Sequence, residues 1–139
     1  MSRAVSFFDF SFESEGPKGA IKKIARFTLI PEYKNVYNFA FGDLDEVTGD
    51  IKDDVVTNNG DGDKVLATVA GIIYDFTTKF PETAIFFQGS TPARTRWYQM
   101  GINRHWGEIG QISKVFGRRG GEWEEFSKGP NFEAFIGRR

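Results

Sequence analysis

The hydrophobic residues of this chain change their spacing at residue 63, and that change restricts the folds the chain can adopt. Before it, Phe8, Phe10 and Phe12 alternate with polar residues, which is the pattern of a strand with one face in water. After it, apolar residues recur at helical spacing until Pro81 ends the run. These helical residues are Val65, Leu66, Val69, Ile72, Ile73, Phe76 and Phe80.

The rest of the chain divides into short segments of the same two kinds. Strands are predicted over residues 4–13, 21–30, 36–41, 83–88, 112–116, 122–126 and 132–136, and a second helix from Thr91 to residue 109. Lys22 and Lys23 interrupt the alternation of the second strand, which suggests a bulge. We expect an α+β domain with a mainly antiparallel sheet, in the order βββαβαβββ, and two helices on one face.

Composition favours one domain spanning 1–139, since 40% of the 139 residues are hydrophobic and 16% aromatic. There is no cysteine, which fits a reducing cytosol and excludes thiol nucleophiles and cysteine-bound metal. No signal-peptide pattern precedes Asp9, and no apolar run approaches the roughly 20 residues of a membrane span. We expect a cytoplasmic protein with no membrane partner.

Charge is distributed unevenly, although the net charge is only −1. Residues 43–63 carry eight acidic side chains and one basic one, whereas residues 94–139 carry nine basic and five acidic ones. A basic surface attracts nucleotides or nucleic acid, but an acidic segment folded against it would cancel its field. Nucleic acid is therefore one hypothesis among several.

The segment from residue 89 to residue 96 has the features of an anion site. An apolar strand runs into Gly-Ser-Thr, Pro92 suits the first helical position, and two arginines follow in the first turns. Free backbone N–H groups and the positive end of a helix dipole attract anions. The residues predicted to bind a phosphate or carboxylate here are Ser90, Thr91, Arg94, Arg96 and Tyr98.

Arg94 falls on the inner stripe of the second helix together with Tyr98 and His105. A half-buried arginine needs a partner, either an anionic ligand or a protein carboxylate. Arg96 is about 200° away around the helix, so the two arginines cannot share one narrow face and one of them is predicted to be structural. His105, the single histidine, fits a hydrogen-bonded core residue better than a catalytic base.

Asp43 and Asp45 lie on the same side if the third strand continues through them, a geometry that suits a metal ion or proton transfer. They are also the carboxylates expected to pair with Arg94. No histidine or second carboxylate cluster stands at ligand spacing, so we predict no metal and no other cofactor.

Lys64 stands in the first turn of the first predicted helix, where a cation opposes the helix dipole unless it contacts an anion. We therefore include it in the predicted ligand site. Residues 58–64 have part of the spacing of a calcium loop but lack its glycine and its final glutamate. A glycine-rich turn with Asp61 or Asp63 capping the helix is the favoured interpretation.

Two motifs, Asn59-Gly-Asp-x-Asp-Lys-Val-Leu66 and Gly89-Ser-Thr-x-x-Arg-Thr-Arg96, stand in this order after the segment 35–45. With these elements, most of the chain resembles a family of small, uncharacterised bacterial proteins, a domain of unknown function. The resemblance implies a bacterial, cytoplasmic protein and assigns no catalytic or binding residue.

Three functions stay open. The first is binding of a phosphate-bearing ligand, a nucleotide or nucleic acid, at the helix starts near Lys64 and Thr91. The second is a non-catalytic protein-interaction module, or a homodimer, that uses the acidic segment 43–63 or the basic C-terminal third. The third is a metal-independent, toxin-like nuclease or transferase that uses Arg94, Tyr98, His105 and Lys64.

Overall fold

The computed structural model describes residues 7–52, 60 and 62–139. None of the described helices is long and apolar enough to cross a membrane. Within these residues the chain forms, in order, β1 (Phe7–Gly16), β2 (Gly19–Leu29), β3 (Val36–Asp43), α1 (Gly62–Lys79), β4 (Ala84–Phe87), α2 (Pro92–Arg104), α3 (Trp106–Ile112), β5 (Lys114–Arg119), β6 (Glu122–Glu125) and β7 (Ala134–Arg138).

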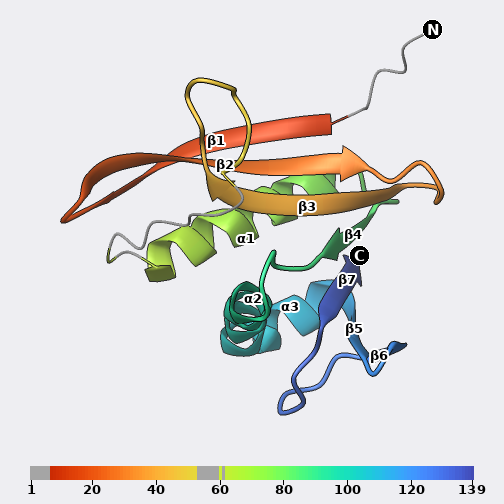
Figure 1. The fold of residues 1–139 in the computed structure, drawn as a ribbon. Helices are drawn as coiled ribbons and strands as arrows, with labels where there is room; N and C mark the ends of the chain where they lie inside the picture. The colour runs from red at the N-terminus through yellow and green to blue at the C-terminus, as the bar shows by residue number, and fades with distance from the viewer. Residues whose placement is uncertain (1–6, 53–59, 61) are drawn as a thin grey trace, which may run out of the picture.

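The described strands form one seven-stranded sheet in the order β1-β2-β3-β4-β7-β5-β6 (Figure 1). Neighbouring strands in it are antiparallel except β3 and β4, which run parallel. The exception follows from α1, since a helix between two strands lets the second run in the direction of the first. The prediction of an α+β domain with a mainly antiparallel sheet is confirmed.

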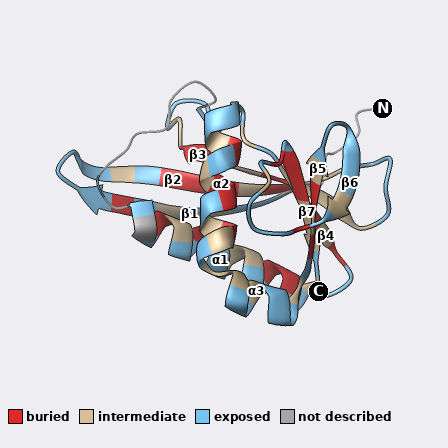
Figure 2. Cartoon of the chain, turned by 90° about the horizontal axis from the view of Figure 1, so that it is seen from below, coloured by how far each residue is buried: buried red, intermediate tan, exposed pale blue. Residues whose placement is uncertain are grey.

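The helices lie inside the bend of the curved sheet, all on one side of it (Figures 1 and 2). α1 packs there through Phe76, whose ring stacks on Phe27 of β2 with centroids 4.0 Å apart. α2 packs there through Tyr98, whose ring meets Phe39 of β3 and Phe87 of β4. Strand register puts the sheet residues of this core in one row: Phe8, Phe27, Phe39, Phe87, Phe135 and Gly117.

β2 contains no bulge. Its pairing with β1 is continuous from Gly19 to Thr28, and the alternation places Lys23 on the helix-facing side of the sheet. Lys23 is only 1% exposed and forms an ion pair with Asp43 of β3, its cross-strand neighbour. The lysine that suggested a bulge is therefore a buried residue with a buried partner.

The second predicted helix is two helices in the structure, so the order of the described elements is βββαβααβββ instead of βββαβαβββ. His105 separates α2 from α3 with φ −108° and ψ 18°, outside the helical range. Gly101, Gly107 and Gly110 weaken the helical preference of this stretch. The change of direction lets Trp106 pack on Phe126, with ring centroids 4.6 Å apart.

The C-terminal hairpin turns at Gly120-Gly121, so its turn is shorter than the connection 117–121 that lies between the predicted strands 112–116 and 122–126. Both glycines have positive φ, 60° and 80°, and they connect the cross-strand pair Arg119 and Glu122. Positive φ at both central residues is the conformation of a two-residue type I′ turn. The last strand is Ala134–Arg138, two residues later than expected.

The loop before α1 lies largely outside the described residues. The calcium-like spacing and the predicted Asp61 cap fall there, and so does the side chain of Asp63.

Candidate functional site

The turn before α2 is held together by its own hydrogen bonds. Thr91 Oγ1 accepts a hydrogen bond from the Arg94 N–H (3.2 Å), and Pro92 has no N–H to offer. Thr95 Oγ1 accepts from the Gly89 N–H (2.9 Å), and a Cβ on Gly89 would lie 2.4 Å from Thr95 N. The Gly-Ser-Thr-Pro pattern therefore builds the turn and leaves fewer backbone donors for an anion than the sequence suggests.

The two arginines of this segment differ in burial. Arg94 is half-buried, whereas Ser90, Thr91 and Arg96 are exposed. Among the described residues, no carboxylate forms an ion pair with either guanidinium. Arg94 therefore remains available to an anion.

Lys64 is an exposed residue near the start of α1. Leu66, two residues or about half a turn further along α1, packs against Gly101, where an added Cβ would be 3.1 Å from Leu66 Cδ2. Gly101 is about 15 Å along the axis of α2 from Thr91, at 1.5 Å per residue. The start of α1 thus contacts the C-terminal half of α2 through Leu66, and a phosphate site shared by Lys64 and Thr91 stays a prediction.

Asp43 and Asp45 have separate structural partners. Asp43 is 4% exposed and is paired with Lys23. The Asp45 carboxylate accepts hydrogen bonds from the N–H groups of Val47 (2.9 Å) and Thr48 (3.3 Å), which makes it the first residue of a turn. Neither carboxylate meets Arg94, and no described group of three histidine, aspartate or glutamate side chains is placed to share a metal ion.

The acidic residues that follow β3 neutralise the basic residues of β2. Residues 44–52 rise over the sheet on the side opposite α1 (Figure 1), and Ile51 packs over Gly42, where a Cβ would be 2.7 Å away. Glu46 pairs with Lys22 (3.0 Å) on this side. The described part of the acidic segment therefore folds against basic residues of β2, and not against the basic C-terminal third.

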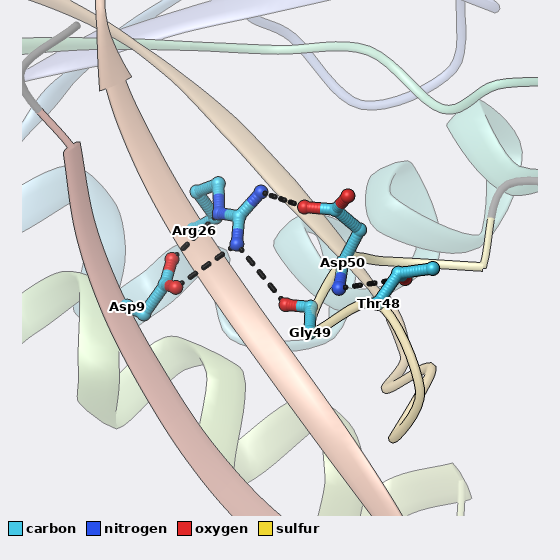
Figure 3. A network of polar contacts seen from close by, with 5 residues as sticks. All are labelled: Asp9, Arg26, Thr48, Gly49 and Asp50. Carbon is cyan, nitrogen blue, oxygen red and sulfur yellow. Dashed lines mark hydrogen bonds and ion pairs between the residues drawn. The ribbon is translucent and has the colours of Figure 1, made fainter. Parts of the chain in front are cut away.

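Arg26 is the centre of a second ion-pair network on the same side (Figure 3). Its guanidinium donates two hydrogen bonds to Asp9 (2.7 and 3.0 Å) and one to Asp50 (3.2 Å). It also reaches the carbonyl oxygen of Gly49 (3.4 Å). The hydrogen bonds that Arg26 donates to Asp9 raise the pKa of Arg26 further above its usual range. This network fastens the loop 44–52 to β1 and β2.

A cavity of about 410 Å³ lies between α1 and the α2–α3 pair. Its floor is the helix-facing side of the sheet, with Phe39, Ile85, Phe87 and Val115. The wall formed by α1 has small, exposed residues that leave the cavity open to solvent: Ala67, Ala70 and Gly71. Two large side chains stand at the rim, Tyr74 (49% exposed) and Ile112 (46% exposed).

Two of the residues predicted from the sequence, Tyr98 and His105, line this cavity two helical turns apart. Tyr98 is buried and His105 half-buried. No described residue forms a hydrogen bond with the imidazole of His105, so the prediction of a hydrogen-bonded core histidine is not confirmed. The cavity therefore contains a histidine whose ring nitrogens are available to a ligand.

Arg139 ties the end of β7 to α1 at another part of the cavity wall. Its Nε donates to Thr77 Oγ1 (3.1 Å) and its Nη2 to the carbonyl oxygen of Tyr74 (3.0 Å). The guanidinium also lies 4.6 Å from the centre of the Tyr74 ring. These contacts satisfy carbonyl and hydroxyl groups in the last turns of α1 and fix one side of the cavity.

The environment of Tyr98 decides what chemistry its phenol can supply. Burial raises its pKa to about 12, although the positive charge of Arg94 acts in the opposite direction. The phenol therefore keeps its proton at neutral pH. It can donate a hydrogen bond to a ligand but cannot act as a general base there.

The cavity was not predicted from the sequence. The signal for it was the spacing of Ala67, Ala70 and Gly71, which recur on one face of α1 at three- and four-residue intervals. Small residues contribute little to a hydrophobic pattern, so these three do not stand out beside the large apolar residues of α1. Arg139 gave no signal, because its partners are distant in the sequence.

Comparison with known proteins identifies the family of the chain. The model of DUF6934, a family of unknown function, matches residues 1–139, so the chain belongs to that family. The resemblance to a domain of unknown function is confirmed at this level. No curated protein and no solved structure matches the chain. The family supplies no ligand or reaction, so a function has to be argued from the site.

Proposed function

We propose that this member of the DUF6934 family binds a small, mostly apolar ligand in the cavity between α1 and α2–α3. The composition of the cavity carries the proposal: about 410 Å³ of space over an aromatic and aliphatic floor, with a lining in which apolar residues outnumber polar ones. Small-molecule sites in proteins have volumes of roughly 300–1,000 Å³ and the same division between apolar walls and a few orienting polar groups.

Gly71 supports this proposal because nothing in the fold explains it. It lies in the middle of α1, its surface is exposed, and a Cβ there would have no atom within 4 Å. Glycine inside a helix costs about 1 kcal/mol relative to alanine. α1 is therefore less stable than it would be with alanine at this position, which lines the cavity. The missing side chain is consistent with room left for a ligand.

The polar groups indicate the kind of ligand. Tyr98 offers a hydrogen-bond donor, and His105 offers a donor and an acceptor in its neutral form. The ligand we propose has an apolar, preferably flat body and one hydrogen-bonding or anionic group. A nucleotide, the first of the hypotheses from the sequence, shares the flat base and the anionic phosphate but is more polar than this description.

The proposal is tested by thermal denaturation in the presence of a panel of nucleosides, nucleotides, aromatic carboxylic acids and fatty acids. A ligand that binds only the folded protein stabilises it by about 2.7 kcal/mol at a hundred times its Kd, and so raises Tm by several degrees. In Ala70→Phe, a ring would occupy the cavity from the wall of α1. We expect this variant to fold and to lose the shift.

Ala93→Phe is the matched control, because Ala93 is exposed in the first turn of α2 and does not line the cavity. It should keep the full shift. If no compound raises Tm, or if Ala70→Phe and wild type shift equally, the cavity is not the ligand site. A shift lost in Arg94→Ala but kept in Ala70→Phe would place the ligand at the start of α2, as the sequence predicted.

A further inference from the structure

The side of the sheet opposite the helices is divided into two parts. Over β2 and β3 it is covered by residues 44–52, whereas no described helix or loop of this kind lies over β4, β7, β5 and β6 (Figure 1). We call this second part the open sheet face. The side chains that matter on it are Phe86, Phe116, Trp123, Lys114, Arg118 and Arg138.

Strand register places these residues on one side of the sheet. Phe86 of β4 and Phe116 of β5 are both cross-strand partners of Ile136 in β7. Arg118 is paired with Trp123 of β6, and Lys114 with Arg138 of β7. Directly opposed residues project to the same face, so aromatic and basic side chains alternate along β5 on the side away from the core.

Two of the aromatic residues, Trp123 and Phe86, are in contact on this face. Trp123 is 44% exposed although it is large and apolar. Its ring meets Phe86 nearly edge-on, with centroids 6.2 Å apart and planes at 73°. The guanidinium of Arg118 lies 5.7 Å from the centre of the same indole. An exposed indole with an arginine above it and a phenylalanine beside it provides a surface for stacking.

The cations of the open sheet face differ from those elsewhere in the sheet. Lys22, Lys23 and Arg26 of β2 each form an ion pair with an acidic residue. Lys114, Arg118 and Arg138 form none with any described carboxylate, and Glu125 is the acid that the register places among them. Glu46 and Asp50 of the acidic loop are therefore paired with β2, and on the open sheet face three cations outnumber one described acid, Glu125.

We propose that the open sheet face binds single-stranded nucleic acid. Flat side chains stack on unpaired bases, and cations beside them neutralise the phosphates that connect those bases. An acidic peptide would use the cations and leave the rings without partners. A duplex would keep its bases stacked on each other and out of reach of Trp123. The combination of both features on one face fits a single strand best.

The experiment measures fluorescence anisotropy of a labelled single-stranded oligothymidylate of about twelve nucleotides, a length typical of one binding face. Binding is expected at low salt and should weaken as salt rises. Trp123→Ala should weaken it about tenfold, the effect of losing one stacked base. Lys114→Ala should lower the slope of log Kd against log salt by about 0.7, the value for one phosphate contact on a single strand.

Arg119→Ala is the matched control, because Arg119 is the neighbour of Arg118 but pairs with Glu124 (2.8 Å). It should bind like wild type. Circular dichroism of each variant shows whether it is folded. Lys114 is exposed, so Lys114→Ala should fold and test the proposal even if Trp123→Ala does not fold. Absence of binding at low salt, equal binding of a duplex or of polyglutamate, or unchanged binding in Trp123→Ala and Lys114→Ala would overturn the proposal.

Discussion

The ring of Phe132 occupies the space that a side chain on Gly117 would need. A Cβ built on Gly117 would lie 2.3 Å from Cδ1 and 2.5 Å from Cγ of that ring. Both residues are buried, and Phe132 packs with Phe126 and Phe135 in a hydrophobic cluster smaller than the one that contains Phe27 and Phe76. The glycine therefore ends the row of phenylalanines across the sheet and admits a ring from the following loop in place of its own side chain.

Gly117→Ala should lower the free energy of unfolding by about 3 kcal/mol, the upper range for overpacking a core, because neither the strand nor the ring can move freely. Denaturant unfolding measures the loss. Gly137→Ala is the control, since its Cβ would be 3.9 Å from the nearest atoms, an ordinary contact. Equal stabilities of the two variants would show that Phe132 relaxes without cost.

Local sequence signals were sufficient for much of the fold. The spacing of Val69 and Phe76 predicted α1, and Thr91-Pro92 predicted where α2 starts, because these patterns depend on neighbours a few residues away. The space over Gly117 could not be predicted, because the ring of Phe132 reaches it through the tertiary fold. For the same reason Lys23 was mistaken for a sign of a bulge, since its partner is twenty residues away.

The candidate site was predicted in part. Tyr98 and His105 were selected because they share a helix stripe, and both line the cavity. The cavity itself depends on the distance between α1 and α2. Small residues such as Ala70 and Gly71 do not predict this distance from the sequence alone. The arginines at 94 and 96 gave the stronger sequence signal, although part of that motif is explained by the hydrogen bonds of the turn.

Gly71→Ala should stabilise the protein by about 0.5–1 kcal/mol, because alanine has the higher helix propensity and its Cβ meets nothing within 4 Å. Gly101→Ala gains the same propensity in α2, but its Cβ would be 3.1 Å from Leu66 and would push the two helices apart. Thermal denaturation of both variants should therefore show a higher Tm for Gly71→Ala only. The same Tm in both would mean that Leu66 yields easily.

Lys23 and Asp43 should be strongly coupled, since both are buried on the helix-facing side of the sheet. Lys23→Met or Asp43→Leu alone removes one member of this buried ion pair, which costs about 3–5 kcal/mol. The double variant removes both charges and should be more stable than the sum of the single losses implies. A double-mutant cycle by urea unfolding measures this difference, and strictly additive losses would contradict the coupling.

Tyr98 should make the protein lose stability at alkaline pH. Burial raises its pKa from 10 to about 12, so the folded state favours the neutral phenol. Its contribution is complete below the unfolded pKa of about 10 and is lost as pH rises through 12, where the folded phenol also ionises. Two pKa units correspond to about 3 kcal/mol.

The measurement is denaturant unfolding of wild type and Tyr98→Phe from pH 8 to pH 12, with the difference between the two proteins taken at each pH because other tyrosines and lysines titrate in both. The wild type should lose about 3 kcal/mol more than the variant across this range, since phenylalanine has no proton to lose. Parallel losses in the two proteins would mean that the phenol of Tyr98 ionises without cost, and therefore that it is solvated through the cavity instead of buried against Phe39 and Phe87.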